Sequence, residues 1–323
     1  MTAVRSPRSV ARTTSPHWTA IAESTCVWGI WLMYAVYRVF GRLLFRIILY
    51  PVVFYYWATN TRARRASLDF LRRAHAHAGR SGPQPGLRQS LRHFASFAET
   101  LLDKMLAIGG RYRFGAVRCE GTELMHEQLD SGRGGLIVTA HVGCLELCRA
   151  LAARAGLRVN ILVHTLHAEQ FNRILARLDP QTDVRLIQVS DISPATALLL
   201  REKLAAGEFL AIAGDRVPQG TGRTASLPFL GAPALFPLGP YALAALLECP
   251  LFAMGCVRDG DGHLMRFTEL AREVKLPRAG RAAALAGYAK AYAEWLAALV
   301  AGSPYDWFNF FDFWAGGDVE PAA

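Results

Sequence analysis

The sequence predicts an α/β fold with a mostly parallel central sheet flanked by helices, preceded by an N-terminal membrane-binding helical arm. Short apolar runs rich in β-branched residues indicate strands that are buried on both faces. Helical stretches lie between these runs, and the alternation favours right-handed crossovers and a parallel sheet. A long apolar segment near the N-terminus, flanked by arginines, predicts the arm.

The composition is typical of a folded protein, but the charge is unevenly distributed. Of 323 residues, 52% are hydrophobic and 19% are charged, which excludes a disordered chain and allows one large α/β domain or two smaller ones. Residues 1–80 hold 12 arginines and 2 acidic residues, whereas residues 81–323 hold 24 basic and 24 acidic side chains. Because the basic excess surrounds the apolar segment, it favours membrane lipids, and no nucleic acid, as the partner.

The apolar segment of the arm spans residues 27–57 and carries only three charges, Arg38, Arg42 and Arg46. A spacing of four residues places their guanidinium groups on one stripe of a continuous helix. The longest charge-free runs, about 14 or 15 residues, are shorter than the roughly 20 residues that a spanning helix needs. The pattern favours an interfacial helix whose arginines face phosphate head groups. A tilted span with snorkelling arginines and a buried core helix are the alternatives.

We expect four parts along the chain. They are a basic flexible N-terminus (1–26), the helical arm (27–80), the α/β domain (85–315) and a C-terminal tail (316–323). The Gly- and Pro-rich stretch GRSGPQPG at 79–86 separates the arm from the domain. A basic helix is expected before it, at 62–78, and a second helix after it, at 87–108.

Within the α/β domain, five apolar runs are the expected strands of the sheet. They are LIVTA (136–140), VNILV (159–163), VRLIQV (184–189), FLAIA (209–213) and LFAMGCV (251–257). Ser193 as N-cap and Pro194 as the first helical residue begin a helix that ends at Gly207. An antiparallel strand is expected at 263–270 and an Ala-rich helix at 281–301.

His141 and Glu146 follow the first of these strands, in the sequence HVGCLE. Ligands and catalytic groups in open α/β sheets gather beyond the carboxyl ends of the strands. Residues five apart on a regular helix point about 140° apart, so the two side chains meet only if His141 lies in a turn before the helix, as Gly143 allows. In that geometry Glu146 accepts a hydrogen bond from one imidazole nitrogen, and the other nitrogen takes a proton from an attacking hydroxyl or amine.

The residues around this pair resemble a known family at several separate points. HVGCLE after an apolar strand resembles the H-x4-D/E block of the lysophospholipid acyltransferase superfamily, and its Glu resembles the lipid A biosynthesis (lauroyl/myristoyl) acyltransferase branch. Residues 207–244 are similar to that branch's second block, a strand ending in an acidic residue, a loop, a Pro-Phe-hydrophobic-Gly turn and a helix rich in small residues. YRVFGR in the arm and the closing YDWFNFFDFW (305–314) look like a predicted acyltransferase subgroup associated with glycosyltransferases and aryl-polyene-type pathways.

By this resemblance, His141 and Glu146 form the catalytic pair, with His141 as the general base, and Asp215 belongs to the active site. The resemblance also implies five substrate-binding residues, which are Gly143, His164, Arg173, Arg216 and Phe229. Of these, Arg216 is the candidate for binding an anionic group. In the segment HTLHAEQFNR, His164, His167 and Arg173 are all candidates for the place of an arginine of the lipid A branch. The F-P-E-G-T block of glycerophosphate-type relatives is missing, which argues against a lysophosphatidate acceptor.

Together these features predict a membrane-bound enzyme on the cytoplasmic face of the bacterial inner membrane. It would move a fatty acyl group from a thioester of acyl carrier protein or coenzyme A to a hydroxyl or amine of a lipid or glycolipid acceptor. No metal or redox cofactor is implied. A catalytically inactive homologue that binds lipid or acts as a scaffold is the alternative; an esterase is disfavoured because the chain has no G-x-S-x-G motif.

Six cysteines allow two further interpretations of the same region. Cys144 and Cys148 could join His141 and Glu146 as zinc ligands, but no second Cys/His pair completes such a site. A nucleophilic Cys144 would need surroundings that stabilise a thiolate. Small, buried and reduced thiols are the more common arrangement in a chain without a short secreted disulfide framework.

Overall fold

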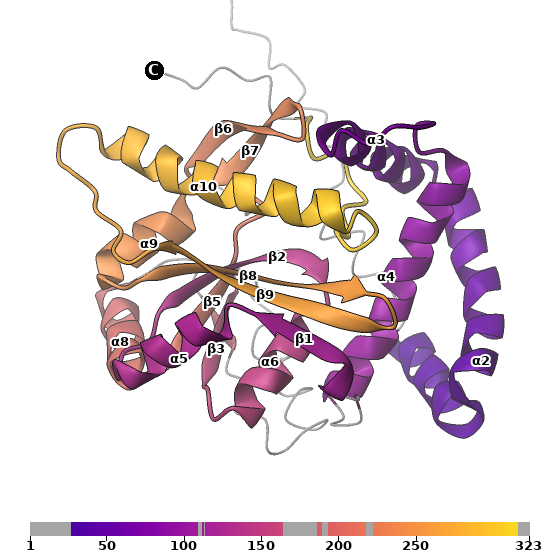
Figure 1. The fold of residues 1–323 in the computed structure, drawn as a ribbon, viewed down its shortest axis with the longest axis horizontal. Coiled ribbons are helices and arrows are strands. Elements are labelled where there is room, and N and C mark those ends of the chain that lie inside the picture. Colours follow the sequence, from indigo (N-terminus) through magenta and orange to yellow (C-terminus); the bar gives the residue numbers. More distant parts are fainter. Residues whose placement is uncertain are drawn as a thin grey trace, which may run out of the picture. The chain divides into compact units, whose positions relative to one another are not determined.

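The computed structural model describes residues 27–108, 112, 114–163, 186–188, 193–217 and 222–315. The chain divides into two compact units, one that ends at Leu49 and one that begins at Tyr50. The larger unit contains a seven-stranded sheet with helices on both faces (Figure 1). The predicted α/β fold with a mostly parallel sheet is therefore confirmed.

The sheet is parallel except at one pair of strands. Its members are β1 (Val117–Glu120), β2 (Leu136–Gly143), β3 (Val159–Val163), β4 (Leu186–Gln188), β5 (Phe209–Ala213), β8 (Leu251–Asp259) and β9 (Gly262–Ala271). Their order across the sheet is β1-β9-β8-β2-β5-β3-β4, and among these described strands only β8 and β9 pair antiparallel. The central strand β2 therefore has parallel neighbours on both sides, so its carboxyl end lies beside that of β5.

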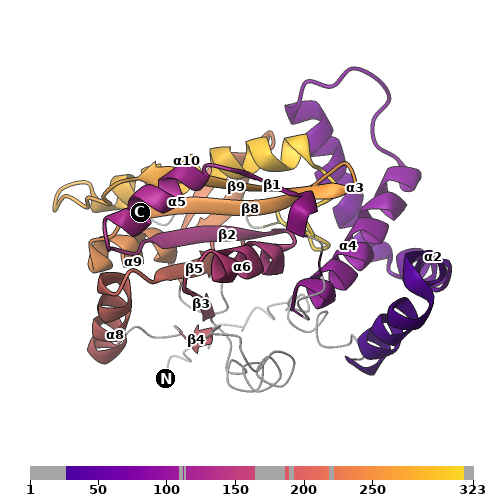
Figure 2. The same ribbon diagram turned by 60° about the horizontal axis from the view of Figure 1, so that its bottom comes forward.

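Helices cover both faces of the sheet (Figures 1 and 2). One core contains α9 (Gly239–Leu247) and α10 (Arg281–Gly302), together with side chains of α3 (Thr61–His77) and α8 (Pro194–Ala205). The other core contains side chains of α5 (Thr122–Asp130) and α6 (Leu145–Arg154). Val138 of β2 points into the first core and Ile137 into the second, which explains why the strand is apolar at successive positions.

The expected elements of the domain are found close to their predicted bounds. β3 and β5 have the predicted ends, α4 spans Leu87–Ile108, and β9 pairs antiparallel with β8. Helix α8 begins at Pro194, and the backbone N–H of Thr196 donates to the Ser193 hydroxyl at 3.1 Å. The predicted N-cap is thus confirmed.

Other elements were not predicted. They are β1, α5, the 3₁₀ turn at Phe114–Ala116 and an antiparallel hairpin of β6 (Thr224–Phe229) and β7 (Ala232–Pro237). β1 is a four-residue edge strand, VRCE, with little apolar character. The hairpin contains Pro228, Pro233 and Pro237. Proline would interrupt the hydrogen bonds of a central strand, but it is tolerated here because the hairpin is a two-stranded sheet separate from the main one.

The arm helix departs from its prediction at Gly41. Helix α2 (Val27–Thr59) is interrupted there, because Gly41 has φ 76° and ψ −174°. The predicted single stripe of Arg38, Arg42 and Arg46 required a continuous helix, so that prediction is wrong: the break falls between the first two arginines. Among the described residues, we find no helix whose length and hydrophobicity would let it cross a membrane.

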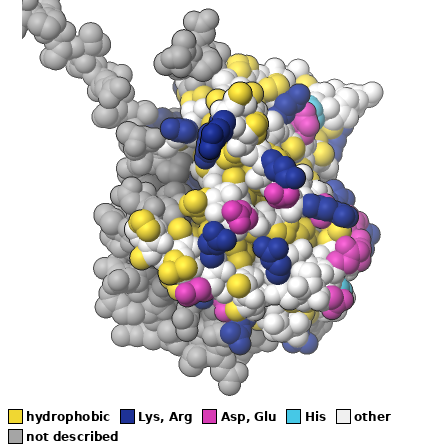
Figure 3. Space-filling view, turned by 90° about the vertical axis from the view of Figure 1, so that its left-hand side faces the viewer, with side chains coloured by type: hydrophobic (Ala, Val, Ile, Leu, Met, Phe, Trp, Pro, Cys, Tyr) yellow, Lys and Arg dark blue, Asp and Glu magenta, His cyan; other side chains and the backbone are white. Residues whose placement is uncertain are grey.

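Two of the four predicted parts, residues 1–26 and 316–323, lie outside the described residues. The basic helix α3 is part of the larger unit. On the face of the molecule shown in Figure 3, basic and acidic side chains are interspersed with apolar ones. This mixture reflects the equal numbers of basic and acidic residues in 81–323.

Candidate active site

The carboxyl end of β2 forms the predicted turn from strand to helix. His141 lies near the end of the strand, and α6 follows with Cys144 as its N-cap residue. Gly143 has a φ of 56°, and a Cβ atom there would clash with the carbonyl oxygen of Cys256 on β8. Only glycine fits this turn without distortion. The position that we predicted for substrate binding is thus fixed by backbone packing.

Asp215, which follows the neighbouring strand β5, holds the imidazole of His141. The sheet register pairs Thr139 with Ala213, so two residues further along each strand His141 lies beside Asp215. Nδ1 of His141 lies 2.8 Å from Oδ1 of Asp215, and the backbone N–H of His141 donates to Oδ2 at 2.9 Å. A carboxylate partner assigns the proton to Nδ1, which leaves Nε2 with a lone pair.

The pair combines a buried carboxylate with a half-exposed imidazole. The side chain of Asp215 is 1% exposed and that of His141 is 39% exposed. Burial by itself would raise the pKa of the Asp215 carboxyl, but His141 and the Arg216 guanidinium lower that pKa below its usual range. Asp215 is therefore an anion at neutral pH, and it can stabilise an imidazolium ion next to it.

Glu146 does not bind His141 in the described structure. Its carboxylate oxygen Oε1 lies 3.3 Å from Nζ of Lys104 on α4. We expected Glu146 to accept a hydrogen bond from the imidazole; that contact is replaced by an ion pair, because the first turn of α6 directs Glu146 toward a cation on another helix. Burial lowers the pKa of Lys104, but Glu146 and Cys144 together raise it above its usual value, so Lys104 stays charged.

The other predicted substrate-binding residues have different surroundings. Arg216 donates through Nη2 to the carbonyl oxygen of Phe308 at 3.2 Å, and its guanidinium lies 5.4 Å from the ring centre of Phe311. Burial lowers the pKa of Arg216, and Asp215 opposes that shift. The side chain of Phe229 is 1% exposed, so it belongs to the core and does not line the site as expected. His164, His167 and Arg173 lie outside the described residues.

The cysteines near His141 are buried. Cys144 is 0% exposed, and burial followed by the nearby Glu146 charge raises the pKa of its thiol well above the usual range. A raised thiol pKa disfavours the thiolate that a nucleophile needs. In the part of the chain that the structure describes, no group of three or more His, Cys, Asp and Glu side chains is arranged to hold a metal ion.

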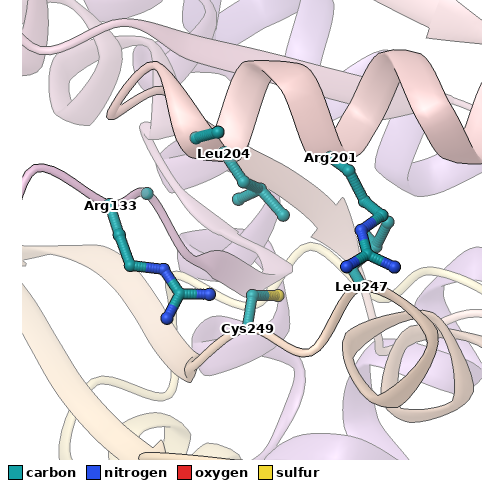
Figure 4. A pocket seen from close by; sticks show the side chains of 7 residues that line it. Arg133, Arg201, Leu204, Leu247 and Cys249 are labelled. Atoms are coloured by element: carbon teal, nitrogen blue, oxygen red, sulfur yellow. The ribbon is translucent and has the colours of Figure 1, made fainter.

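A cavity of about 120 Å³ lies at the amino ends of the strands, at the other end of β2 from His141. Its lining includes Gly134, just before β2, and Cys249, just before β8 (Figure 4). Arg133 and Arg201 also contribute to it. Gly134 and Cys249 lie at the amino ends of their strands, whereas His141 lies near the carboxyl end of β2. The cavity is therefore not part of the His141 site.

Two residues of the site were missed by the sequence analysis. Lys104 lies on α4 and pairs with Glu146, and the indole Nε1–H of Trp307 donates to Oδ2 of Asp215 at 3.1 Å. Neither residue lies near the H-x4-E motif in the sequence, and no local spacing connects them to it. Only the assembled fold brings them to the carboxyl ends of β2 and β5.

Comparison with known proteins identifies one family. The model of that family, described as bacterial lipid A biosynthesis acyltransferase, matches residues 92–315. The match includes His141, Glu146, Asp215 and Trp307. A search of curated proteins gave no match.

Proposed function

Since the chain belongs to the bacterial lipid A biosynthesis acyltransferase family and is therefore an acyltransferase that acts on lipid, we propose that it uses an acyl thioester as donor. The acceptor is a hydroxyl or amine of a lipid or glycolipid, and the donor is a fatty acyl thioester of acyl carrier protein or coenzyme A. The resemblance of the closing segment to a subgroup associated with glycosyltransferases and aryl-polyene-type pathways supports a glycolipid acceptor.

The observation that carries this proposal is the bond between the Nδ1 of His141 and the buried Asp215 carboxylate. Nε2 of His141 removes the proton from the acceptor hydroxyl or amine as that atom forms a bond to the thioester carbonyl carbon. The tetrahedral intermediate then collapses, the C–S bond breaks, and the imidazolium returns the proton to the departing thiolate. Asp215 remains ionised throughout and stabilises the imidazolium.

Charged groups near the pair support an anionic substrate. Arg216 directly follows Asp215 in the chain, and its charge acts to lower the pKa of both Asp215 and Lys104. Lys104 is held by Glu146 at 3.3 Å, and its side chain is 31% exposed. We assign Lys104 and Arg216 to a phosphate of the donor or acceptor, and Glu146 to the positioning of Lys104.

The test of the proposed function is mass spectrometry of total lipid extracts. Cells that express the native protein are compared with cells that express His141→Ala at a matched membrane level. We expect a lipid that is heavier by one acyl chain only with the native protein, and its mass identifies the acceptor. The same heavier lipid in both extracts would overturn the role of His141. Identical extracts without it, in a host that supplies the acceptor, would favour the inactive lipid-binding alternative.

The end of α2 that belongs to the larger unit supports a location on the membrane. Tyr50 donates to Glu99 at 2.6 Å and Trp57 donates to Ser90 at 3.1 Å, so these side chains face α4. The outward side chains are also apolar: Val52, Phe54 and Tyr55 are between 55% and 70% exposed. Exposed apolar side chains that gather on one helix face are typical of a surface that contacts lipid or another protein.

Arginines follow this surface directly in the sequence. Arg62, Arg64, Arg65, Arg72 and Arg73 all lie on α3. Basic residues beside an apolar surface favour binding to anionic lipid. Membrane proteins also carry an excess of Lys and Arg in their cytoplasmic segments, so these arginines favour the cytoplasmic side. We therefore assign the protein to the cytoplasmic face of the inner membrane, with the arm as its anchor.

Replacing Val52, Phe54 and Tyr55 together by serine is expected to weaken binding to phosphatidylglycerol-containing vesicles by at least about tenfold. Each large apolar side chain contributes about 1.5 to 3 kcal/mol when it is fully removed from water. The measurement is co-sedimentation of the full chain with vesicles. A matched control replaces Leu198, Leu199 and Leu246, which are 44–60% exposed on α8 and α9, by serine. Equal binding by both variants would contradict the lipid surface.

A further inference from the structure

A short C-terminal segment, Asp306–Phe308, which we call the strap, fixes the end of β2 that carries His141. Val142 and Trp307 form an isolated antiparallel bridge. The N–H of Phe308 donates to the carbonyl oxygen of His141 at 3.0 Å, and the N–H of Gly143 donates to that of Asp306 at 2.7 Å. The strap therefore holds the backbone on both sides of Val142, next to His141 itself.

The central residue of the strap also contacts the Asp215 carboxylate. The indole Nε1–H of Trp307 donates to Oδ2 of Asp215 at 3.1 Å. The same oxygen accepts the backbone N–H of His141, while Oδ1 faces the imidazole. Because both carboxylate oxygens are bound, the carboxylate plane is fixed relative to the imidazole.

We propose that Trp307 is a positioning residue of the acyltransferase, which orients Asp215 so that Asp215 can orient His141. This inference rests on the proposed function, in which His141 is the general base. Trp307 touches neither the acceptor nor the thioester in this mechanism. It acts through the carboxylate, and its contribution is expected in the rate of the chemical step.

The indole itself is rigidly packed. Trp307 is 1% exposed, and its ring centre lies 4.8 Å from that of Phe70, 4.9 Å from that of Phe313 and 5.4 Å from that of Phe229. All three contacts are edge-to-face. The ring has little freedom to rotate, so the direction of its N–H is set by the core.

A buried histidine fixes the backbone of Trp307. Nε2 of His93 on α4 lies 2.9 Å from the carbonyl oxygen of Trp307, and Nδ1 lies 3.0 Å from the hydroxyl of Ser67. Burial lowers the pKa of His93 to about 4, so the ring is neutral at pH 7. A neutral ring satisfies both contacts when Nε2 carries the proton and donates to Trp307, and Nδ1 accepts from Ser67.

Two further hydrogen bonds lead from α2 to Ser67, and in each of them the donor is the group farther from His93. Trp57 Nε1–H donates to the Ser90 hydroxyl at 3.1 Å, and Ser90 donates to Ser67 at 3.0 Å. The chain of hydrogen bonds thus runs from the end of α2 through α4 and α3 into the strap. Each hydrogen bond of the chain has one defined donor and one defined acceptor, and such a satisfied network favours one geometry.

The test compares two tryptophans of the same aromatic cluster in the full chain. Trp307→Phe keeps an aromatic ring but removes the N–H that faces Asp215. Trp314→Phe is the matched control: Trp314 is 8% exposed, and its Nε1–H donates to the carbonyl oxygen of Phe229 at 3.1 Å, away from the pair. Both variants lose one buried indole N–H, but only the N–H of Trp307 donates to the Asp215 carboxylate.

We expect Trp307→Phe to lower kcat about 10- to 10²-fold with little change in KM, because Asp215 is then no longer fixed in the plane that orients the imidazole, and small misplacements cost up to about 10²-fold in rate. Without that donor, Asp215 is a stronger acceptor and stabilises the imidazolium more. The acidic side of the pH–rate profile is therefore expected to move to a higher pH than in the native protein. Trp314→Phe should leave both kcat and the profile close to those of the native protein.

An equal fall in kcat for the two variants, with an unshifted pH profile in Trp307→Phe, would overturn the inference and leave Trp307 with a packing role. Urea unfolding of both variants measures their stability. If Trp307→Phe does not fold, β-(3-benzothienyl)alanine at position 307 keeps the ring volume and still lacks the N–H donor. His141→Ala is assayed alongside: its retention of native activity would refute the proposed function, whereas an inactive His141→Ala with a native-like Trp307→Phe refutes only the positioning role.

Discussion

Asp215→Asn is expected to lower kcat of acyl transfer by about 10³- to 10⁴-fold while the protein stays folded. Asparagine has nearly the same shape, but its neutral amide cannot stabilise the imidazolium that forms on His141. Its NH₂ group would also favour the tautomer with the proton on Nε2, the nitrogen that must be free to act as the base. The measurement is kcat of the purified full-length protein with an acyl thioester donor, with circular dichroism as the check on folding.

Glu146→Gln is the comparison that gives this result its meaning. Oε1 of Glu146 lies 3.3 Å from Nζ of Lys104, whereas Oδ1 of Asp215 lies 2.8 Å from Nδ1 of His141. We expect Glu146→Gln to raise KM for the substrate that carries the phosphate and to lower kcat far less than Asp215→Asn. A fall in kcat as large as that of Asp215→Asn would show that the motif glutamate, and not only Asp215, supports the base.

Gly143→Ala is expected to lower the free energy of unfolding by about 3 kcal/mol or more, the largest effect on stability that we predict. The added Cβ would clash with the carbonyl oxygen of Cys256, and the φ of 56° is unfavourable for alanine. Relief of the clash would move the end of β2 away from β8 and would displace His141. The measurement is the urea midpoint of unfolding, with activity measured on the folded fraction.

Gly156→Ala separates the penalty for alanine at a positive φ from the penalty for the clash with Cys256. Gly156 follows α6 and has a φ of 76°, but a Cβ there would have no atom within 4 Å. This control therefore carries the conformational penalty alone, about 1 to 2 kcal/mol. Equal destabilisation by the two variants would mean that the contact with Cys256 relaxes easily and that Gly143 does not fix the turn.

The sequence predicted most of the sheet because buried parallel strands are apolar at every position. LIVTA and FLAIA could be recognised without any partner, and Ser193 with Pro194 marked the start of a helix through local chemistry alone. The edge strand β1 and the proline-containing hairpin lack such a local signal. β1 pairs with β9, which is distant in the sequence. The two hairpin strands are neighbours in the chain, but their prolines hide the pattern that indicates a strand.

The candidate site divides in the same way. The motif identified His141, and the resemblance brought in Asp215, but the choice of which acid binds the imidazole depended on the sheet register. Glu146 is closer in the sequence, yet α4 supplies a cation that pairs with it. The break at Gly41 is a second case, because a regular spacing of arginines does not reveal where the helix itself stops.

By itself, the sequence determined the fold class, the order of the main strands and helices along the chain, the family resemblance and the position of His141 after the first apolar strand, because these depend on hydrophobic periodicity and on short motifs. Only the tertiary structure decided that Asp215 contacts the His141 imidazole, that Lys104 pairs with Glu146 and that Trp307 donates to the same carboxylate. Each of these contacts joins residues from different elements. A hydrogen bond or an ion pair requires its atoms to lie within about 4 Å, and only the packed arrangement of the elements sets that distance.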